Sequence, residues 1–299
     1  MKTPDRPAGL RKFEIPGRVA LVTGSGGLPQ VRAQAEAGIA EIYLHGAHVA
    51  GFQKSGEPPL LFMSARSRFA SGQPIRGGVP ICFPWFGPRA GAEAHGFARL
   101  TEWEWIGART VPGGATVSFR LPPTAIPGGW PAFDAEFSVT VTDQLVMELV
   151  TTNRSDRQFD FEDCLHTYFA VGDIGRISLA GLEGAAYLDY AAGAGGTRRV
   201  DNAGSLRITG ETNRAYLDTT AAVEIRDEML GRIIRIEKSG SQSTVVWNPG
   251  LTQKMPDDFD PAEHRRMVCV ESGNVKQNGI ELAPGSRSAL RVTLSSRPL

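Results

Sequence analysis

Short runs of alternating apolar and polar residues dominate this 299-residue chain and limit the folds open to it. Alternation with a period of two puts successive side chains on opposite faces of an extended strand. Glycine (35 residues) and proline (20 residues) are scattered between the runs, where they mark turns. Helical candidates are few and short, so the chain is predicted to be all-β, with large and mostly antiparallel sheets. The predicted strands are Ala115–Leu121, Phe137–Thr142, Leu145–Thr152, Gln158–Phe161, Ala222–Ile225, Ile233–Glu237, Thr244–Trp247 and Leu290–Leu294.

Two turn segments between these runs predict hairpins. Asn153–Asp156 follows the run Leu145–Thr152, and Asp227–Gly231 follows the run Ala222–Ile225. Both segments are rich in turn formers, so each is expected to join its run to the next one in an antiparallel pair. Ala191–Gly196 is rich in glycine and alanine and is expected to form a flexible loop.

Length and charge set wide limits on organisation and partners. A chain of 299 residues allows one large domain or two, since all-β domains often exceed about 200 residues. The 32 Lys and Arg residues balance the 32 Asp and Glu residues, which argues against a nucleic acid or an anionic membrane as partner. Residues 1–12 carry no apolar run, and no membrane-length apolar stretch occurs, so a cytoplasmic protein is expected. No exposed amphipathic helix is evident, and a monomer is expected.

Cysteine and histidine spacing argues against disulfides and metal sites. Cys82, Cys164 and Cys269 are an odd number at distant positions, without a Cys-x-x-Cys pair. Each is expected to be a small buried apolar residue in a reducing compartment. His45 and His48 are spaced as His-x-x-His, but on a strand that spacing points the rings to opposite faces, so no metal ion is expected.

The glycines after Val19–Thr23 imitate a nucleotide-binding loop. A dinucleotide fingerprint needs its last glycine to open a helix whose N-terminus holds the pyrophosphate. Here Ser25–Gly27 is followed by Leu28 and Pro29, and then by an alternating run from Val31. Because the required helix is missing, the segment is predicted to be a hairpin turn between two strands.

The densest group of chemically useful residues is Ile75–Pro88, followed by His95–Arg99. Glycines and prolines keep the first stretch irregular, aromatic rings give it flat apolar surfaces, and Arg76, His95 and Arg99 add polar groups. Rings beside planar donors suit a sugar, whose faces carry C–H groups and whose rim carries hydroxyls. A packed loop under a sheet, with both arginines in structural ion pairs, fits the same residues equally well.

Two further segments carry a candidate acid and a candidate base. If the strand runs unbroken through Phe159–Phe169, parity places His166 on the same face as Glu162, Cys164 and Tyr168. This histidine is either a proton donor, since its ordinary pKa of about 6.5 lies near working pH, or a hydrogen-bonded structural residue. Glu271 ends a short apolar strand before a turn, where its carboxylate either accepts a proton in a cleft or is solvated.

Six segments, in their order and spacing, carry a resemblance to a known family: Leu44–Val49, Ile75–Pro88, His95–Arg99, His166–Phe169, Val246–Pro249 and Val270–Asn274. They resemble the hexose-6-phosphate mutarotases, also called glucose-6-phosphate 1-epimerases, within the aldose 1-epimerase superfamily. The resemblance runs from about Leu28 to the C-terminus. It implies a β-supersandwich fold in a single domain over residues 1–299, with residues 1–12 loosely ordered.

The resemblance also implies roles for particular residues. His166 is the acid that protonates the pyranose ring oxygen, and Glu271 is the base that takes the proton of the anomeric hydroxyl. His95 is a second sugar-binding histidine. Arg76 and Arg99 clamp a phosphate, a task that suits the planar guanidinium fork. No cofactor is implied, because nothing is oxidised and no group is transferred.

The implied activity is interconversion of the α and β anomers of an aldohexose 6-phosphate, with glucose 6-phosphate as the expected substrate. A mutarotase of unphosphorylated aldoses and a non-catalytic sugar-phosphate-binding protein are the alternatives. The chain departs from the family at two positions. Asn213 stands where relatives often carry a sugar-binding Asp, and Gly250 stands where they often carry an aromatic residue.

Overall fold

The computed structural model describes residues 9–191, 193, 195–200 and 204–299, and its regular structure is almost entirely β. Every helix in these ranges is a 3-10 turn of three to six residues, and none has the length or apolar character needed to cross a membrane. Residues 1–8 of the N-terminal segment and residues 192 and 194 of the glycine-rich segment lie outside the described residues. The 3-10 turns are η1 (Arg11–Phe13), η2 (Ser25–Gly27), η3 (Ala98–Leu100), η4 (Pro123–Ala125), η5 (Ile174–Arg176), η6 (Pro261–Arg266) and η7 (Lys276–Asn278).

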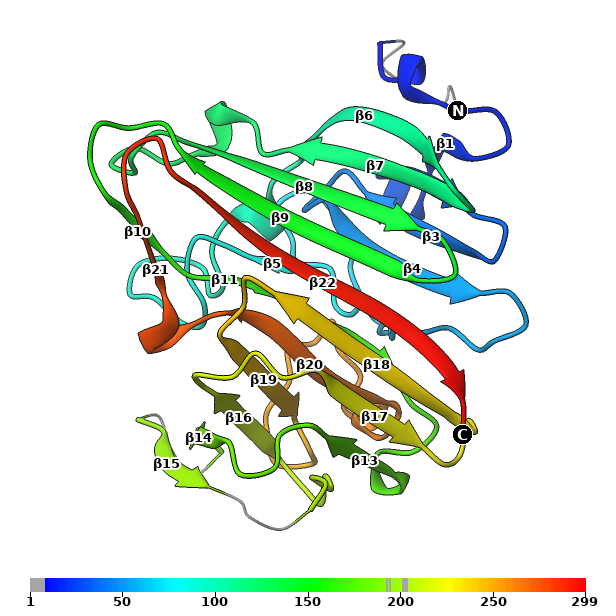
Figure 1. Cartoon of the computed structure of the whole chain (residues 1–299), viewed down its shortest axis with the longest axis vertical. Coiled ribbons are helices and arrows are strands. Elements are labelled where there is room, and N and C mark those ends of the chain that lie inside the picture. Colours follow the sequence, from blue (N-terminus) through cyan, green and yellow to red (C-terminus); the bar gives the residue numbers. More distant parts are fainter. Residues whose placement is uncertain (1–8, 192, 194, 201–203) are drawn as a thin grey trace.

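One antiparallel sheet of eight strands forms a continuous layer across the molecule, with the red β22 between the green β9 and the gold β18 (Figure 1). Its strands, in spatial order, are β13 (Ile177–Ala180), β17 (Val223–Asp227), β18 (Arg232–Ser239), β22 (Arg287–Pro298), β9 (Leu145–Asn153), β8 (Phe133–Val141), β7 (Gly114–Arg120) and β6 (Glu104–Val111). Burial alternates along β8, so one face of this sheet covers the core. The hairpin predicted at Asp227–Gly231 is confirmed, because β17 pairs with β18.

A second sheet of eight strands carries residues of the candidate site. Its strands are β15 (Thr197–Val200), β14 (Ala186–Asp189), β16 (Thr212–Tyr216), β19 (Ser243–Asn248), β20 (Met267–Asn274), β11 (Asp163–Leu165) and β5 (Ile81–Cys82), with β12 (Tyr168–Ala170) also paired to β20. Every residue of β20 is buried. Both faces of this strand are therefore covered, one by the main core and the other by the side chains of the site.

Two smaller sheets complete the fold. The four-stranded sheet contains β1 (Val19–Thr23), β2 (Pro29–Gln34), β3 (Gly38–Tyr43) and β4 (His48–Lys54), and the two-stranded sheet contains β10 (Phe159–Phe161) and β21 (Ile280–Leu282). The pairing of β1 with β2 confirms that the glycines between them form a hairpin turn. At Gly26 the backbone has φ +64°, and an added Cβ would lie 1.8 Å from the Phe69 carbonyl oxygen. The glycines there allow a tight turn and let the backbone at Gly26 approach the Phe69 carbonyl group closely.

The main apolar core lies between the sheets and draws on each of the three larger ones. Ile42 from β3, Phe137 from β8 and Val268 from β20 belong to one contiguous cluster of fully buried side chains. Burying a large apolar side chain contributes roughly 1.5–3 kcal/mol. The sheets therefore form one sandwich around a shared core, as an all-β prediction requires.

The hairpin predicted at Asn153–Asp156 is wrong. β9 already has β8 on one edge and β22 on the other, so it offers no edge to the next strand. β10 pairs with β21 instead. Asn153 helps to turn the chain away, because its side-chain amide donates to the carbonyl oxygens of Arg157 and Leu282, each at 2.8 Å.

Candidate active site

The alternation of β20 divides its side chains between core and site. Val268 and Val270 belong to the main core, whereas Cys269 and Glu271 point to the opposite face. The predicted strand end at Glu271 is wrong, because β20 continues to Asn274 by pairing with β11. Cross-strand pairing overrides the turn character of Ser-Gly-Asn there. Glu271 consequently lies inside a strand with only 1% of its surface exposed.

His166 lies in a break between two short strands. The unbroken strand on which the parity argument was conditional does not form: β11 ends before His166, and β12 begins after Thr167. The His166 backbone N–H donates to the Pro80 carbonyl at 3.0 Å. Because β11 and β12 both pair with β20, the break still leaves the His166 side chain on the Glu271 side of the sheet.

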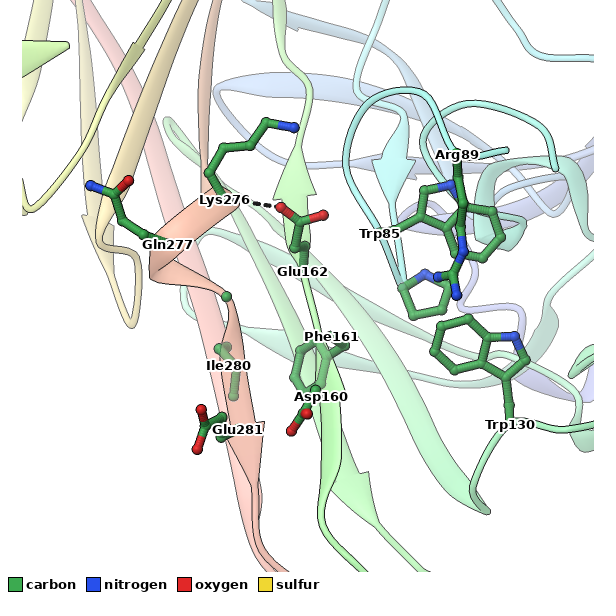
Figure 2. Close-up of a pocket in the computed structure, with 12 residues that line it drawn as sticks. Trp85, Arg89, Trp130, Asp160, Phe161, Glu162, Lys276, Gln277, Ile280 and Glu281 are labelled. Atoms are coloured by element: carbon green, nitrogen blue, oxygen red, sulfur yellow. Dashed lines mark hydrogen bonds between the residues drawn. The ribbon is translucent and has the colours of Figure 1, made fainter. Parts of the chain in front are cut away.

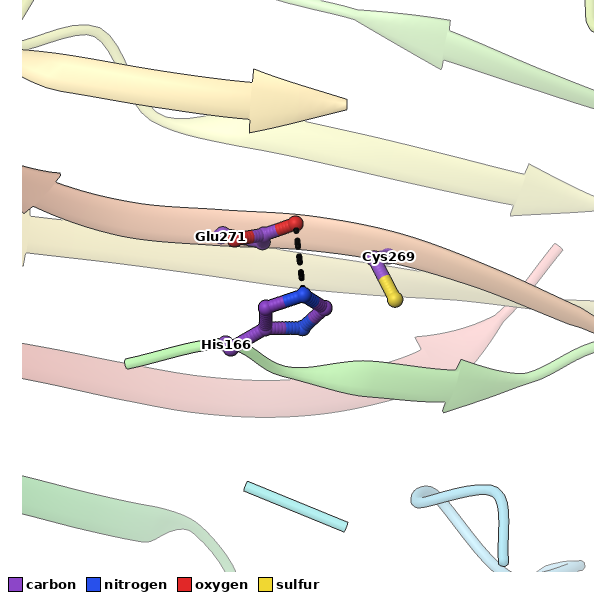
Figure 3. A group of neighbouring side chains, drawn as sticks. All are labelled: His166, Cys269 and Glu271. Carbon is purple, nitrogen blue, oxygen red and sulfur yellow. Dashed lines mark ion pairs between the residues drawn. The ribbon is translucent and has the colours of Figure 1, made fainter. Parts of the chain in front are cut away.

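The imidazole and the carboxyl group meet directly (Figure 3). His166 Nε2 lies 3.3 Å from Glu271 Oε1, although the two residues come from distant parts of the chain. The other carboxyl oxygen, Oε2, is 3.7 Å from Cys164 Sγ. The His166 ring stacks on Tyr168, with 4.8 Å between ring centroids, and Trp247 lies edge-on at 6.2 Å. Aromatic packing thus fixes the plane of the imidazole.

Burial makes both members of this pair prefer their uncharged forms. It raises the pKa of Glu271 well above its ordinary value, against the opposing hydrogen bond from Cys164. The pKa of His166 lies well below its ordinary value because of burial, with further lowering by His95, Arg99 and Arg76. In the free site the carboxyl group therefore holds the proton, and His166 is neutral.

His95 lies beside His166, with 5.6 Å between ring centroids, and packs edge-on against Phe86 at 4.9 Å. Its Nδ1 accepts a hydrogen bond from the Gly87 N–H at 3.3 Å. Burial, followed by the positive charges of Arg99 and Lys276, lowers the pKa of His95 to about 3. A neutral ring whose Nδ1 is an acceptor carries its proton on Nε2, which makes His95 a hydrogen-bond donor.

Two arginines add positive charge beside these histidines. Arg76 Nε donates to Asp258 Oδ2 at 3.0 Å, so this arginine does form one of the ion pairs that a purely structural reading expected. Arg99 Nη2 donates to the Ala94 carbonyl at 2.9 Å, and its buried Nε has no hydrogen-bond partner among the described residues. Both charges lower the pKa of His166, so both act on the same site.

Asn213 reaches the site through the register of the sheet. It pairs with Trp247, and Trp247 pairs with Cys269, which puts these side chains in one row on the site face. Glu271 lies in the adjacent row of the same face. At Gly250 the backbone has φ +56°, and an added Cβ would lie 2.5 Å from the Glu211 nitrogen, so an aromatic residue there requires a different backbone.

Two groups of residues bear on the prediction that no metal ion is bound. His45 and His48 do not share a strand, because β3 ends before His45 and β4 begins at His48. Within the described ranges, one group of three potential ligands lies together: the ligand atoms of His166, Cys269 and Glu271 are within 4.8 Å of one another (Figure 3). Such donors suit zinc. The acid and base pairing of the same groups requires no ion, so the absence of a required metal remains a prediction.

Sequence reasoning missed several site residues. The three cysteines are free and buried as expected, but Cys164 and Cys269 also line the site beside Glu271. Lys276, in η7 after β20, lies with its Nζ close to Gly87, whose N–H binds His95. The signal for the cysteines was available in strand parity, since Cys269 shares the parity of Glu271. No local pattern marked Lys276.

Known proteins are similar to this chain over nearly all of its length. The aldose 1-epimerase family model matches residues 29–295. A protein of Escherichia coli (strain K12), provisionally named glucose-6-phosphate 1-epimerase, is 34% identical over 255 residues, which are 82% of this chain and 80% of that protein. A protein of the same provisional name from Cenchrus ciliaris is 31% identical over 271 residues, 87% of this chain and 82% of its own length. The crystal structure of a provisionally named mutarotase from Salmonella typhimurium superposes with a TM-score of 0.87 at 27% identity, covering 96% of both chains. These likenesses confirm the expected fold class.

The turn that carries His95 gives a first prediction. Gly96 has φ +75°, and an added Cβ would lie 1.9 Å from the Phe83 carbonyl oxygen; Gly91 has φ +70° with open space around it. Gly91→Ala should cost roughly 1–2 kcal/mol of unfolding free energy from left-handed strain alone. Gly96→Ala should cost about 1–3 kcal/mol more, because the carbonyl must move. Urea unfolding of both variants measures the difference, and equal losses would contradict the close approach at Gly96.

A second prediction concerns acid stability. Burial lowers the pKa of His48 to about 3, whereas an unfolded chain has the ordinary value near 6.5. Between these values the unfolded state binds more protons, so this contribution to stability is complete above pH 6.5 and is lost as pH falls toward 3. The slope reaches about 1.4 kcal/mol per pH unit. Burial raises the pKa of Asp163 to about 7, so this carboxyl group has the opposite effect on the pH dependence of stability.

The test isolates His48 by difference. His48→Gln should flatten the dependence of unfolding free energy on pH in the acid range, relative to the unchanged chain. Urea titrations at several pH values measure both slopes. Parallel slopes would show that His48 does not stay neutral in the folded protein.

Proposed function

The chain belongs to the aldose 1-epimerase family, and on that basis we propose that it interconverts the α and β anomers of an aldohexose 6-phosphate, with glucose 6-phosphate as substrate. The 3.3 Å approach of His166 to Glu271, beside two arginines whose charges act on His166, is the observation that supports this most strongly. An isomerase of this class acts on a small sugar, and both anomers have the same composition.

A cyclic hemiacetal presents two oxygens on one carbon, the ring oxygen and the anomeric hydroxyl. In the proposed reaction His166 donates a proton to the ring oxygen while Glu271 accepts the proton of the hydroxyl. The bond from the anomeric carbon to the ring oxygen breaks, its electron pair stays on that oxygen, and an aldehyde forms. Rotation about the next carbon–carbon bond presents the other face. Reclosure with the two roles reversed restores both groups, so no oxidant, reductant or cofactor is consumed.

The proton must move before the ring opens. In the free site it lies on Glu271, whereas the reaction starts with a protonated His166 and an ionised Glu271. Arg76 and Arg99 oppose that transfer, because their charges lower the pKa of His166. A phosphate held by the two guanidinium groups offsets those charges and favours the proton on His166. Binding of the substrate phosphate thereby favours a protonated His166 and an ionised Glu271 at the same time.

Other groups of the site have proposed binding roles. His95 donates from Nε2 to a sugar oxygen, consistent with its neutral ring. Asn213 contacts a hydroxyl through its amide, without the charge of an aspartate. Arg76 stays tethered to Asp258 through Nε, which leaves the rest of its guanidinium group for phosphate oxygens.

Rate measurements on glucose 6-phosphate test the acid and base. Glu271→Gln and His166→Gln should each slow anomer interconversion by about 10²–10⁴-fold, the usual contribution of one positioned acid or base. Polarimetry or exchange NMR gives the rate. His264→Gln, a change at a buried histidine in η6, is the control for loss of a histidine elsewhere in the fold.

Two results would reject this function. Folded protein that leaves the interconversion rate of glucose 6-phosphate at its value in buffer is not an epimerase of this sugar. Tight binding of the sugar phosphate without acceleration would favour a binding protein on the same scaffold.

A fourth prediction addresses the phosphate. Arg76→Met should raise the KM for glucose 6-phosphate by about 10-fold to 100-fold, because a charge-assisted hydrogen bond contributes roughly 1.5–3 kcal/mol. The KM for glucose should change little. Arg66→Met is the matched control, since Arg66 forms a comparable ion pair with Asp260 at 3.1 Å, in the same part of the chain. An equal rise in the KM for glucose 6-phosphate and for glucose would favour a mutarotase of unphosphorylated aldoses.

A further inference from the structure

We infer that Lys276 is a specificity-determining residue of the proposed site, and that its ammonium group binds the phosphate of the substrate from the His95 side of the site. This inference rests on the proposed function. It adds a residue that neither the sequence motifs nor the resemblance marked.

The lysine lies at the beginning of η7, immediately beyond the strand that holds Glu271. Its Nζ lies 5.8 Å from the centroid of the Phe86 ring and 5.9 Å from that of Tyr190. An added Cβ on Gly87 would lie 3.4 Å from the same nitrogen. The ammonium group therefore lies against the loop whose Gly87 N–H binds His95.

Lys276 also borders a second, open pocket of about 370 Å³ (Figure 2). Trp85 and Trp130 form one side of that pocket, and Asp160 and Glu281 belong to the other. The side chain of Lys276 extends away from Glu281 in this view. Its contacts to Phe86 and Tyr190 place the ammonium group toward the Phe86–Gly87 segment, whose Gly87 N–H binds His95.

The positive charge of Lys276 lowers the pKa of His95, and the ammonium group has no ion-pair partner among the described residues. Among the positive charges that lower the pKa of His95, Lys276 comes after Arg99 and before Arg76. In the described ranges no carboxylate forms an ion pair with Lys276, whereas Arg76 has Asp258. Its two aromatic contacts lie near the outer limit of about 6 Å for a cation–π interaction. The ammonium group is thus free to bind an anion without breaking an ion pair.

The backbone at Lys276 is held in an unusual conformation. Its φ of +59° lies in the left-handed region, which residues other than glycine rarely adopt. The Glu162 carboxylate accepts a hydrogen bond from the Lys276 N–H (Figure 2). Its other oxygen accepts one from the Phe86 N–H at 2.9 Å. One carboxylate therefore ties the lysine to the aromatic residue that packs on His95. Strained backbone held in this way is found preferentially at functional sites.

Three variants test the inference. Lys276→Met keeps the length of the side chain and removes its charge, whereas Lys276→Arg keeps the charge. Lys12→Met is the matched control, because Lys12 is an exposed lysine whose Nζ lies 4.8 Å from the Phe13 ring centroid, outside the proposed site. Thermal unfolding of each variant verifies that the fold is retained.

Lys276→Met should raise the KM for glucose 6-phosphate about tenfold, with kcat and the KM for glucose little changed, because one charge-assisted contact is lost. Lys276→Arg should remain near the unchanged enzyme. Calorimetry with inorganic phosphate should show weaker binding to Lys276→Met by a similar factor, and no change for Lys12→Met. Equal effects on glucose, or phosphate binding that ignores the substitution, would overturn the inference.

The two proposals fail in different ways. If the unchanged chain does not accelerate interconversion of glucose 6-phosphate, the proposed function is wrong. The phosphate titration then still decides whether Lys276 belongs to an anion site. If the unchanged chain is active and Lys276→Met retains its KM, only the inference about Lys276 is wrong.

Discussion

The pairing of β20 with both β11 and β12 is the constraint on which the rest of the site depends. It brings His166 Nε2 to 3.3 Å from Glu271 Oε1 and leaves Val268 and Val270 in the main core. A shift of one residue in this register would exchange the two faces, putting the carboxyl group into the apolar core. The same hydrophobic burial that fixes the register therefore fixes the acid and the base.

Burial gives these groups their chemistry as well as their position. A carboxyl group and an imidazole in contact with solvent would both keep ordinary pKa values. Here burial raises the pKa of Glu271 and lowers that of His166, so the pair shares one proton without separated charge. Reversible interconversion needs such a pair, because each group must donate in one direction and accept in the other.

The sequence predicted strands and two short hairpins correctly, but it did not predict the pairings between strands distant in sequence. Alternation located β7, β8, β9, β10, β17, β18, β19 and β22, since strand periodicity is local. The hairpin expected at Asn153–Asp156 failed because β9 already pairs with the preceding strand β8 on one edge and with the distant strand β22 on the other. Glu271 was misplaced at a strand end for the same reason, as β11 extends β20 through turn-forming residues. The residues alone made His166 and Glu271 candidates with structural alternatives left open, and the resemblance assigned their roles. Lys276 depends on a backbone conformation that no local pattern encodes.

A chain with no net charge is well suited to a dianionic substrate when its positive charges are concentrated. Arg99, Lys276 and Arg76 all lower the pKa of His95, and two of them also act on His166. In the proposed reaction a neutral sugar leaves those charges uncompensated, so His166 stays unprotonated even after the sugar is bound. A phosphate offsets them at the moment of binding. Discrimination between phosphorylated and free sugars would then arise in the proton transfer itself, in addition to the binding step.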